Sequence, residues 1–355
     1  MPKVTVISSI YNKEQFLDKF FSSILFQSFT DFVFLVIDNG STDNSKEKIQ
    51  KYSKIDSRIL PIYLEKNIGP AGAFALGIDN VKTDFFTICD SDDYVEKNFL
   101  QILYNSITSE EADVSMCGYD KVWGDGKVIV HNRPDKDKLV FTKKDRSNLL
   151  AQIIDQYSNK HLGCYLSEIG VNWGKMFRTE FIKSNNINYE NDVWIWCDWL
   201  FNIRLFKQIN KFVYINNILY HYYQSDNSMT RSTFKMDLKQ KDRIYKAIIR
   251  IGEELKNDKN ILSSYYYFSF RNVMMIANLY CSWFFKCKDI KYRDIKNVLA
   301  ELKNWPGMQL AYQNNRFSIS NKISFFCIKN NFYFLYLAKV TLVKFMKFTK
   351  RIIFR

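Results

Sequence analysis

The first hundred residues predict an α/β fold with a mixed, mostly parallel sheet. Short apolar runs rich in β-branched and aromatic residues alternate three times with helical patterns, and short loops join them. The runs are apolar throughout, which is typical of parallel strands covered on both faces. At 355 residues the chain is long enough for this domain and a smaller one. We expect the first to cover residues 1–234 and a helical region to cover 235–355.

The expected elements follow in order. Strands are expected at Val4–Ile10, Phe32–Ile37, Ile59–Leu64 and Phe85–Ile88. Helices are expected at Lys13–Phe29, Asp43–Tyr52, Gly69–Ile78 and Val95–Ile107. In the first helix, apolar residues recur at helical spacing, so we expect that face to pack in the core. A strand at Asp113–Gly118 and a hairpin turn at Trp123–Lys127 follow, and further helices are expected at Tyr245–Leu255, Tyr265–Phe285 and Asp289–Trp305.

Composition narrows the class of protein. The net charge of +14 favours an anionic partner such as a nucleotide, a nucleic acid or a membrane. Seven cysteines without a Cys-x-x-Cys pair predict reduced thiols and a cytoplasmic protein. The chain begins almost directly with a strand, so we expect no targeting peptide. No run approaches the roughly 20 apolar residues that span a bilayer.

A cluster of carboxylates ends the fourth strand. Asp90-Ser91-Asp92-Asp93 places three acidic side chains within four residues, where like charges repel and raise each other's pKa. A divalent cation would relieve this repulsion and take its remaining ligands from water and a phosphate group. Ligands bind at the carboxyl ends of strands in open α/β sheets. The alternative is a solvated acidic turn in which Ser91 and Asp92 cap the next helix.

Four motifs in this region resemble the family-2 glycosyltransferases of the GT-A fold, in the same order and spacing. They are Val4–Asn12, Ile37–Ser45, Asn67 with Gly69, and Asp90–Asp93. The resemblance implies a nucleotide-sugar donor, expected to carry UDP, a divalent metal (Mn²⁺ or Mg²⁺), and transfer with inversion at the anomeric carbon.

The resemblance also assigns donor-site residues. Ser9 and Tyr11 would line the uridine pocket, with Asn39 near the base edge, where the family usually carries aspartate. An amide oxygen still accepts from a base N–H. Asp90 would lie near the ribose or sugar, and Asp92 would bind the metal, with Asp93 as a second ligand. The remaining donor-site candidates are Asn12, Asp38, Asn67 and Ser91.

Inverting transfer needs a general base that takes the proton of the acceptor hydroxyl. The family keeps it in an acidic pair at a helix start, and Asp198 stands at the second position of that pair, with Cys197 at the first. Three nearby tryptophans would raise the pKa of Asp198 by desolvation. The alternatives are Asp198 as a helix cap or a partner of Arg204. Weaker candidates for the base are Glu190 and Asp192.

Two further segments match the family. Val171–Arg178 resembles the segment that supports the acceptor site. Leu219–Thr230 resembles the closing segment after the last strand, with Tyr223 where the family often has arginine. His221 is expected near the diphosphate or metal, or else simply packed, and Arg231 is expected to meet phosphate.

The end of the chain is strongly basic. After Glu301 it carries ten basic residues and no acidic one. Projected at about 100° per residue, the charges from Lys339 onward fall on one arc, opposite an apolar face that includes Leu335 and Phe345. This pattern, within about 320–355, is typical of a helix lying in a membrane interface. A docked helix with a solvated lysine face is the alternative, and no recognition motif supports nucleic acid.

The leading hypothesis is therefore a metal-dependent inverting glycosyltransferase, attached peripherally to the inner face of the membrane. Its acceptor would be a hydroxyl of a glycan, lipid-linked or protein-linked molecule in cell-surface polysaccharide or glycoconjugate synthesis. One alternative is a GT-A-like nucleotidyltransferase. The other is an inactive homologue that serves as a scaffold or activator. The departures from the family at 39, 197 and 223 leave it open, as does Ala73-Phe74-Ala75, where family members often read Ala-Arg-Asn.

Overall fold

The computed structural model describes residues 2–130, 134–154, 166, 168–224, 239–284, 291–303 and 319–340. The chain forms two compact units, Met1–Phe234 and Lys235–Arg355.

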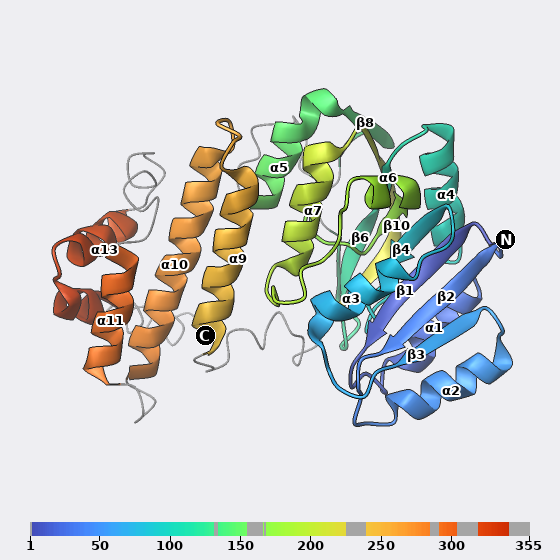
Figure 1. The fold of residues 1–355 in the computed structure, drawn as a ribbon, viewed down its shortest axis with the longest axis horizontal. Coiled ribbons are helices and arrows are strands. Elements are labelled where there is room, and N and C mark those ends of the chain that lie inside the picture. Colours follow the sequence, from blue (N-terminus) through green and yellow to red (C-terminus); the bar gives the residue numbers. More distant parts are fainter. Residues whose placement is uncertain are drawn as a thin grey trace. The chain divides into compact units, whose positions relative to one another are not determined.

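The first unit is built on a ten-stranded mixed sheet, drawn as arrows in Figure 1. The strand order is β3-β2-β1-β4-β9-β6-β10-β5, with β7 beside β6 and β8 beside β10. The strands are β1 Val4–Ile10, β2 Phe32–Asp38, β3 Ile59–Tyr63, β4 Phe85–Ile88, β5 Tyr94–Val95, β6 Val114–Trp123, β7 Val128–Val130, β8 Lys138–Thr142, β9 Lys175–Arg178 and β10 Lys211–Gln224. Strands β1 to β4 pair in parallel, as do β6 and β10, whereas β9 runs antiparallel between β4 and β6. The predicted mixed sheet is confirmed.

Helices connect and cover these strands. They are α1 Leu17–Leu25, α2 Ser45–Ile55, α3 Gly69–Asp79, α4 Phe99–Ser109, α5 Arg146–Ile154, α6 Thr179–Ser184 and α7 Cys197–Gln208, with a 3₁₀ turn at Lys143–Asp145. Helices α1, α2 and α4 begin later than expected, and α1 and α4 show the reason most clearly. Before α1, the backbone N–H of Lys13 donates to Ser45 Oγ at 3.0 Å and that of Glu14 to Asp43 Oδ2 at 3.1 Å, so these residues join the next loop instead of a helix. Before α4, residues 94–95 pair with β10 as β5.

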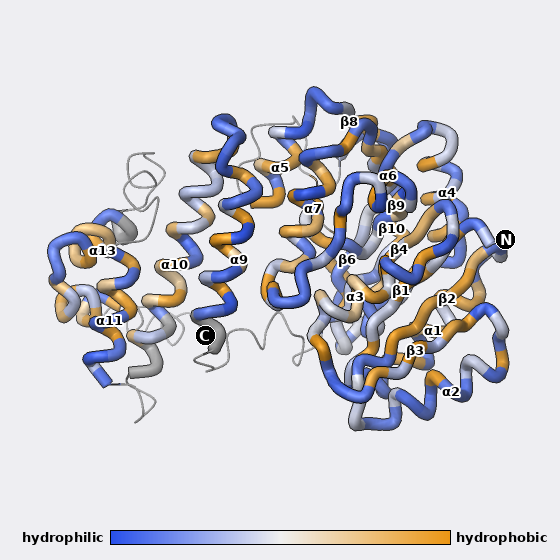
Figure 2. Tube along the Cα trace, in the orientation of Figure 1, coloured by the Kyte–Doolittle hydropathy of each residue, from blue (hydrophilic) through white to orange (hydrophobic). Residues whose placement is uncertain are grey.

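Aromatic side chains fill the core on the α1 side of the sheet. Phe20, Phe21 and Phe34 are fully buried and lie in mutual ring contact. Tyr52 of α2 stacks on Phe21 with ring centroids 4.4 Å apart. Figure 2 shows the hydrophobic strands β1 and β2 beside a mostly hydrophilic α2, as expected for a helix with one buried face. This core fixes the strand ends that carry the polar motifs.

The second unit is helical. It contains α9 Lys239–Leu255, α10 Leu262–Phe284, α11 Tyr292–Lys303, α13 Ile319–Lys329 and a helical stretch at 333–340. The three helices predicted before residue 305 therefore form, with shifted ends. Of the basic segment 320–355, residues 341–355 lie outside the described residues. In the part of the chain that the structure describes, no helix combines the length and apolarity needed to span a bilayer.

Candidate active site

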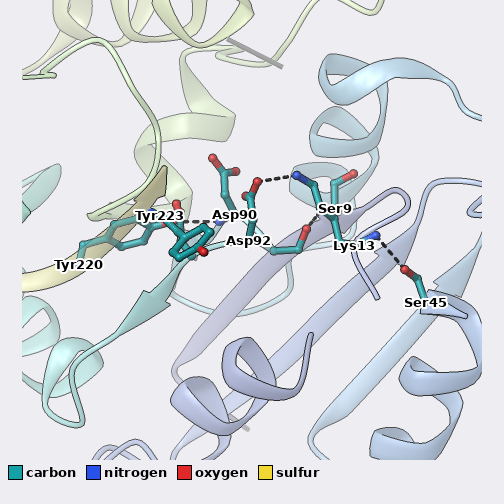
Figure 3. A network of polar contacts seen from close by, with 9 residues as sticks. Ser9, Lys13, Ser45, Asp90, Asp92, Tyr220 and Tyr223 are labelled. Carbon is teal, nitrogen blue, oxygen red and sulfur yellow. Dashed lines mark hydrogen bonds and ion pairs between the residues drawn. The ribbon is translucent and has the colours of Figure 1, made fainter. Parts of the chain in front are cut away.

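The acidic cluster lies at the carboxyl end of β4, beside the end of β1. The Cys89 N–H still donates to Ile7 O at 3.0 Å, and the chain then leaves the sheet. Ser91 is buried and its hydroxyl donates to Ser9 O at 3.1 Å, which ties the cluster to β1. In Figure 3 the carboxylates of Asp90 and Asp92 point to the same side, and Lys13 approaches Asp92.

The cluster carries more negative charge than its surroundings compensate. Burial and the carboxylates of Asp92 and Asp198 raise the pKa of Asp90 to about 8, against an opposing effect of Lys13. The only cation paired with Asp92 among the described residues is Lys13, whose Nζ lies 2.5 Å from Oδ2. One ammonium group balances only part of the negative charge of these carboxylates, so the cluster is suited to bind a further cation.

Asp93 has a different environment. Its Oδ2 accepts a hydrogen bond from the Tyr220 hydroxyl at 2.7 Å, and its Oδ1 accepts one from the Tyr223 N–H at 2.8 Å. The residue is 2% exposed, and burial raises the pKa of its carboxyl well above the ordinary value. These contacts favour a structural role for Asp93, which joins the cluster to β10, and leave Asp92 as the better candidate for a metal ligand.

The residues present fit a metal that shares its coordination with a diphosphate. Among the described residues, no three His, Cys, Asp or Glu side chains form a metal-binding group. Mg²⁺ commonly uses one or two protein carboxylates together with substrate phosphate oxygens, so a complete protein cage is not required.

The expected nucleotide pocket lies where β1 and β2 end. Tyr11 is 42% exposed, so its ring is accessible for stacking on a base. Asn12 Oδ1 accepts from the Thr42 N–H at 2.8 Å, and Asp38 Oδ1 accepts from the Ser41 N–H at 3.0 Å, so both shape the loop after β2.

Asn39 is 2% exposed and already used by the protein. Its Oδ1 accepts from the Ile68 N–H at 2.9 Å, and its Nδ2 donates to Gly69 O at 3.1 Å. Asn67 Oδ1 accepts from the Gly69 N–H at 2.7 Å. The two asparagines therefore fix the start of α3 beside the pocket, and this places Asn39 as a support for the loop.

Asp198 lies in the first turn of α7, where the helix dipole favours a carboxylate. Its Oδ1 accepts hydrogen bonds from the Tyr189 hydroxyl at 3.0 Å and from Asn172 Nδ2 at 3.3 Å. Within the described residues, its Oδ2 has no hydrogen-bond partner. Burial raises the pKa of this carboxyl, and the bonds from Tyr189 and the nearby Lys175 oppose the rise.

The alternatives for Asp198 do not match the geometry. Trp196, with a left-handed φ of 54°, is the cap residue of α7. Arg204 forms an ion pair with Glu190 instead. The carboxylate of Glu190, a weaker candidate for the base, is therefore already paired. Because the charge of Asp198 contributes to the raised pKa of Asp90, the start of α7 lies near the end of β4.

Comparison with known proteins identifies the family. The sequence profile described as Glycosyl transferase family 2 matches residues 5–183, half of the chain. The chain belongs to this family. It is 28% identical over 328 residues to the cholesterol galactosyltransferase of Borreliella burgdorferi, a match that covers 88% of this chain and 86% of that protein. It is 26% identical over 229 residues to glycosyltransferase GlyA of Streptococcus pneumoniae, covering 64% of this chain but only 32% of that protein.

Solved structures agree on the fold. The glycosyltransferase superposes on S. aureus TarS 1-349, solved in complex with UDP-GlcNAc, with a TM-score of 0.67 and 18% identity, over 96% of this chain and 91% of that chain. The expected GT-A fold is confirmed.

Of the two remaining donor-site candidates of the glycosyltransferase, the structure describes His221. His221 faces carboxylates on both sides: Nδ1 lies 2.8 Å from Asp120 Oδ1 and Nε2 lies 3.0 Å from Glu96 Oε1. Its ring stacks on Tyr94 with centroids 4.5 Å apart. Side chains alternate along a strand, and it is the neighbouring Tyr220 that reaches the acidic cluster. This geometry matches the packed alternative for His221. Arg231 lies outside the described residues.

Several residues of this site were not singled out from the sequence. In the acidic cluster, Lys13 pairs with Asp92 and Tyr220 binds Asp93. Around Asp198 they are Lys175, Asn202, Asn172 and Tyr189. One signal was available. Lys175 begins β9 just before the apolar Met176 and Phe177, and a lysine that is buried there must have partners.

Proposed function

We propose that this glycosyltransferase transfers a sugar, with inversion, from a nucleoside diphosphate sugar, expected to be a UDP-sugar, to an acceptor hydroxyl. The observation that carries the proposal is the pairing of two features in one site. Asp198, whose Oδ2 has no hydrogen-bond partner among the described residues, lies near the acidic cluster that contains Asp90 and Asp92.

Asp198 is the general base of this proposal. Its Oδ2 takes the proton of the acceptor hydroxyl while the acceptor oxygen attacks the anomeric carbon. The bond from that carbon to the diphosphate breaks with its electron pair on the leaving nucleoside diphosphate. Attack from the opposite face inverts the configuration. The raised pKa brings the carboxyl nearer to the value at which a base is both ionised and effective.

Asp92 is the proposed ligand for Mn²⁺ or Mg²⁺, and Asp90 holds the donor sugar. When bound, the metal supplies positive charge that stabilises the departing diphosphate. Lys13 contributes a second cation beside Asp92. Tyr11 offers the exposed aromatic face for the base.

The relatives suggest the acceptor class. One is named a cholesterol galactosyltransferase, and another a teichoic acid poly(glycerol phosphate) polymerase. We infer an acceptor that is a glycan or is linked to lipid or protein, in cell-surface polysaccharide or glycoconjugate synthesis.

Peripheral attachment to the cytoplasmic face of the membrane is part of the proposal. In the second unit, large apolar side chains are exposed next to the exposed Lys322 and Lys329. They are Ile323, Phe326, Phe332, Phe334 and Leu335. Exposed aromatic and basic residues together suit an anionic bilayer surface.

A panel of nucleotide sugars tests the proposal. Thermal unfolding is measured with each donor, once with Mn²⁺ and once with a chelator, and release of the nucleoside diphosphate is then assayed. We expect one donor to raise Tm only with metal and to be turned over. Binding without turnover across varied acceptors would favour a scaffold, and release of inorganic pyrophosphate from a nucleoside triphosphate and a sugar phosphate would indicate a nucleotidyltransferase.

A further inference from the structure

Lys175 is a fully buried lysine close to the proposed base. It belongs to β9 and is 0% exposed. Its Nζ donates to Ile169 O at 2.7 Å, to Val171 O, and to Asn202 Oδ1 at 3.0 Å. Three acceptors satisfy the three protons of an ammonium group, so the charged form is fully hydrogen-bonded.

Two amides connect this ammonium to Asp198. Asn202 accepts from Lys175 through Oδ1, and its Nδ2 donates to Asn172 Oδ1 at 2.6 Å. Asn172 Nδ2 then donates to Asp198 Oδ1 at 3.3 Å. Every donor in this chain points from the cation towards the carboxylate. Hydrogen bonds aligned in this way polarise one another, most strongly in a buried setting.

We propose that Lys175 is a positioning residue for sugar transfer, which acts through Asn202 and Asn172 to orient Asp198 and to favour its ionised form. This inference rests on the proposed role of Asp198 as the base. The relay holds Oδ1, with help from the Tyr189 hydroxyl, and leaves Oδ2 for the acceptor hydroxyl.

A role in anchoring the loop alone does not account for a buried charge. Asn202 Nδ2 already binds Gly170 O at 3.0 Å, so the 169–172 loop has a neutral anchor. A buried ammonium is costly unless its charge is compensated. Asp198 and Glu168 supply part of that compensation, and Glu168 also pairs with Lys121 at 3.4 Å.

The charges around both groups set the expected direction of the effect. Burial lowers the pKa of Lys175 to about 7, and Asp198 and Glu168 oppose this. Lys175 and the hydrogen bonds of Tyr189 and Cys197 lower the pKa of Asp198 against burial. The carboxylate of Asp90 faces the same space. Removal of the lysine charge therefore raises the pKa of Asp198 further.

The test is the pH profile of kcat/KM for Lys175→Met in the full chain, with the donor found in the screen. We expect the acidic limb to move to higher pH by about one unit, since an opposite charge shifts a pKa by roughly one to three units at close range. We also expect kcat to fall while KM for the donor stays constant. Lys211→Met is the control, because Lys211 likewise donates to a backbone oxygen, Glu110 O at 2.6 Å, but no hydrogen bond among the described residues links its side chain to Asp198.

A second variant covers the case in which Lys175→Met does not fold. Asn202→Ser interrupts the relay and keeps the lysine, and the same shift is expected in smaller measure. UDP binding and thermal unfolding establish that each variant is folded. A pH profile that superposes on wild type after scaling overturns the relay. If Asp198→Asn retains activity, the proposed base itself fails, which is a distinct result.

Discussion

Asp198 shows how one carboxylate can be held and still remain reactive. Its Oδ1 receives the hydrogen bonds of Tyr189 and Asn172, whereas Oδ2 receives none from the described residues. The bonds fix the orientation of the group, and burial keeps it basic. Such a group is tuned for proton transfer and not for stability.

Asp198→Asn should therefore stabilise the protein at neutral pH. Because the pKa of Asp198 is raised in the folded state, the native protein binds the carboxyl proton more tightly than the unfolded chain does. The contribution of Asp198 to the free energy of unfolding therefore falls as pH rises from the ordinary pKa of 3.8 to the raised one. Asparagine does not titrate. The difference in Tm between variant and wild type, measured from pH 4 to 8, should grow with pH and then level off. A difference that is constant with pH would contradict the raised pKa.

Asp92 and Asp93 should respond oppositely to amide substitution. Asp92→Asn should remove Mn²⁺-dependent UDP binding with little loss of stability, because its one ion-pair partner among the described residues is the partly exposed Lys13. Asp93→Asn should lower the free energy of unfolding by about 1–3 kcal/mol, since one buried N–H or O–H donor loses its acceptor. Calorimetric titration and urea unfolding measure the two effects. Equal loss of metal-dependent binding in both variants would make Asp93 a ligand.

At the scale of elements, Gly69 couples the start of α3 to the loop before α7. Its φ is +81°, and a Cβ there would lie 3.0 Å from the ring of Trp194. Its carbonyl also accepts from Asn39. Gly69 is thus one point at which the donor side of the site packs against the loop that leads to the base.

Gly69→Ala should lower both stability and donor affinity. Gly126→Ala is the matched control, because Gly126 has a φ of +82° with open space around its Cβ position. Both variants carry the left-handed penalty of roughly 1–2 kcal/mol, but only Gly69→Ala displaces Trp194. Thermal unfolding and UDP titration should therefore separate the two. Equal effects on UDP affinity would show that the Trp194 contact does not matter.

Strands β1 to β4 could be predicted because each is one continuous apolar run, whereas the short strands β5, β8 and β9 were not predicted. The start of α1 could not, because residues 13 and 14 bind the loop at 43–45, about 30 positions away. The acidic cluster could be recognised as a motif, but the different environments of Asp92 and Asp93 could not. Tyr220 and Tyr223, which bind Asp93, come from β10, 127 and 130 positions later. Local patterns carry no information about such pairs.

At the scale of the whole molecule, the chain combines a catalytic unit with a helical unit that ends in basic residues. The described part of that end exposes Phe326 and Phe334, which are 57% and 71% accessible. Burial of a phenylalanine side chain is worth about 1.5–3 kcal/mol, enough to contribute to binding at a bilayer surface.

The double variant Phe326→Ser and Phe334→Ser should bind anionic vesicles at least tenfold more weakly than wild type, in a flotation assay with phosphatidylglycerol. Deletion of 320–355 should abolish binding, although it also removes the buried Phe325 and Tyr336. Ile249→Ser is the control, since Ile249 is an exposed apolar residue of α9. Undiminished vesicle binding by both the double variant and the deletion would refute the proposal that this end of the chain binds a membrane.

The most direct test of the central claim is sugar transfer by Asp198→Asn, measured together with UDP binding in the presence of Mn²⁺. The account predicts that transfer falls by at least about 10²-fold, the lower range for loss of a general base, while UDP affinity is unchanged. Tyr189→Phe, which removes one hydrogen bond to Oδ1 and leaves Oδ2 in place, should retain measurable transfer. Transfer by Asp198→Asn at a rate close to wild type would contradict the account.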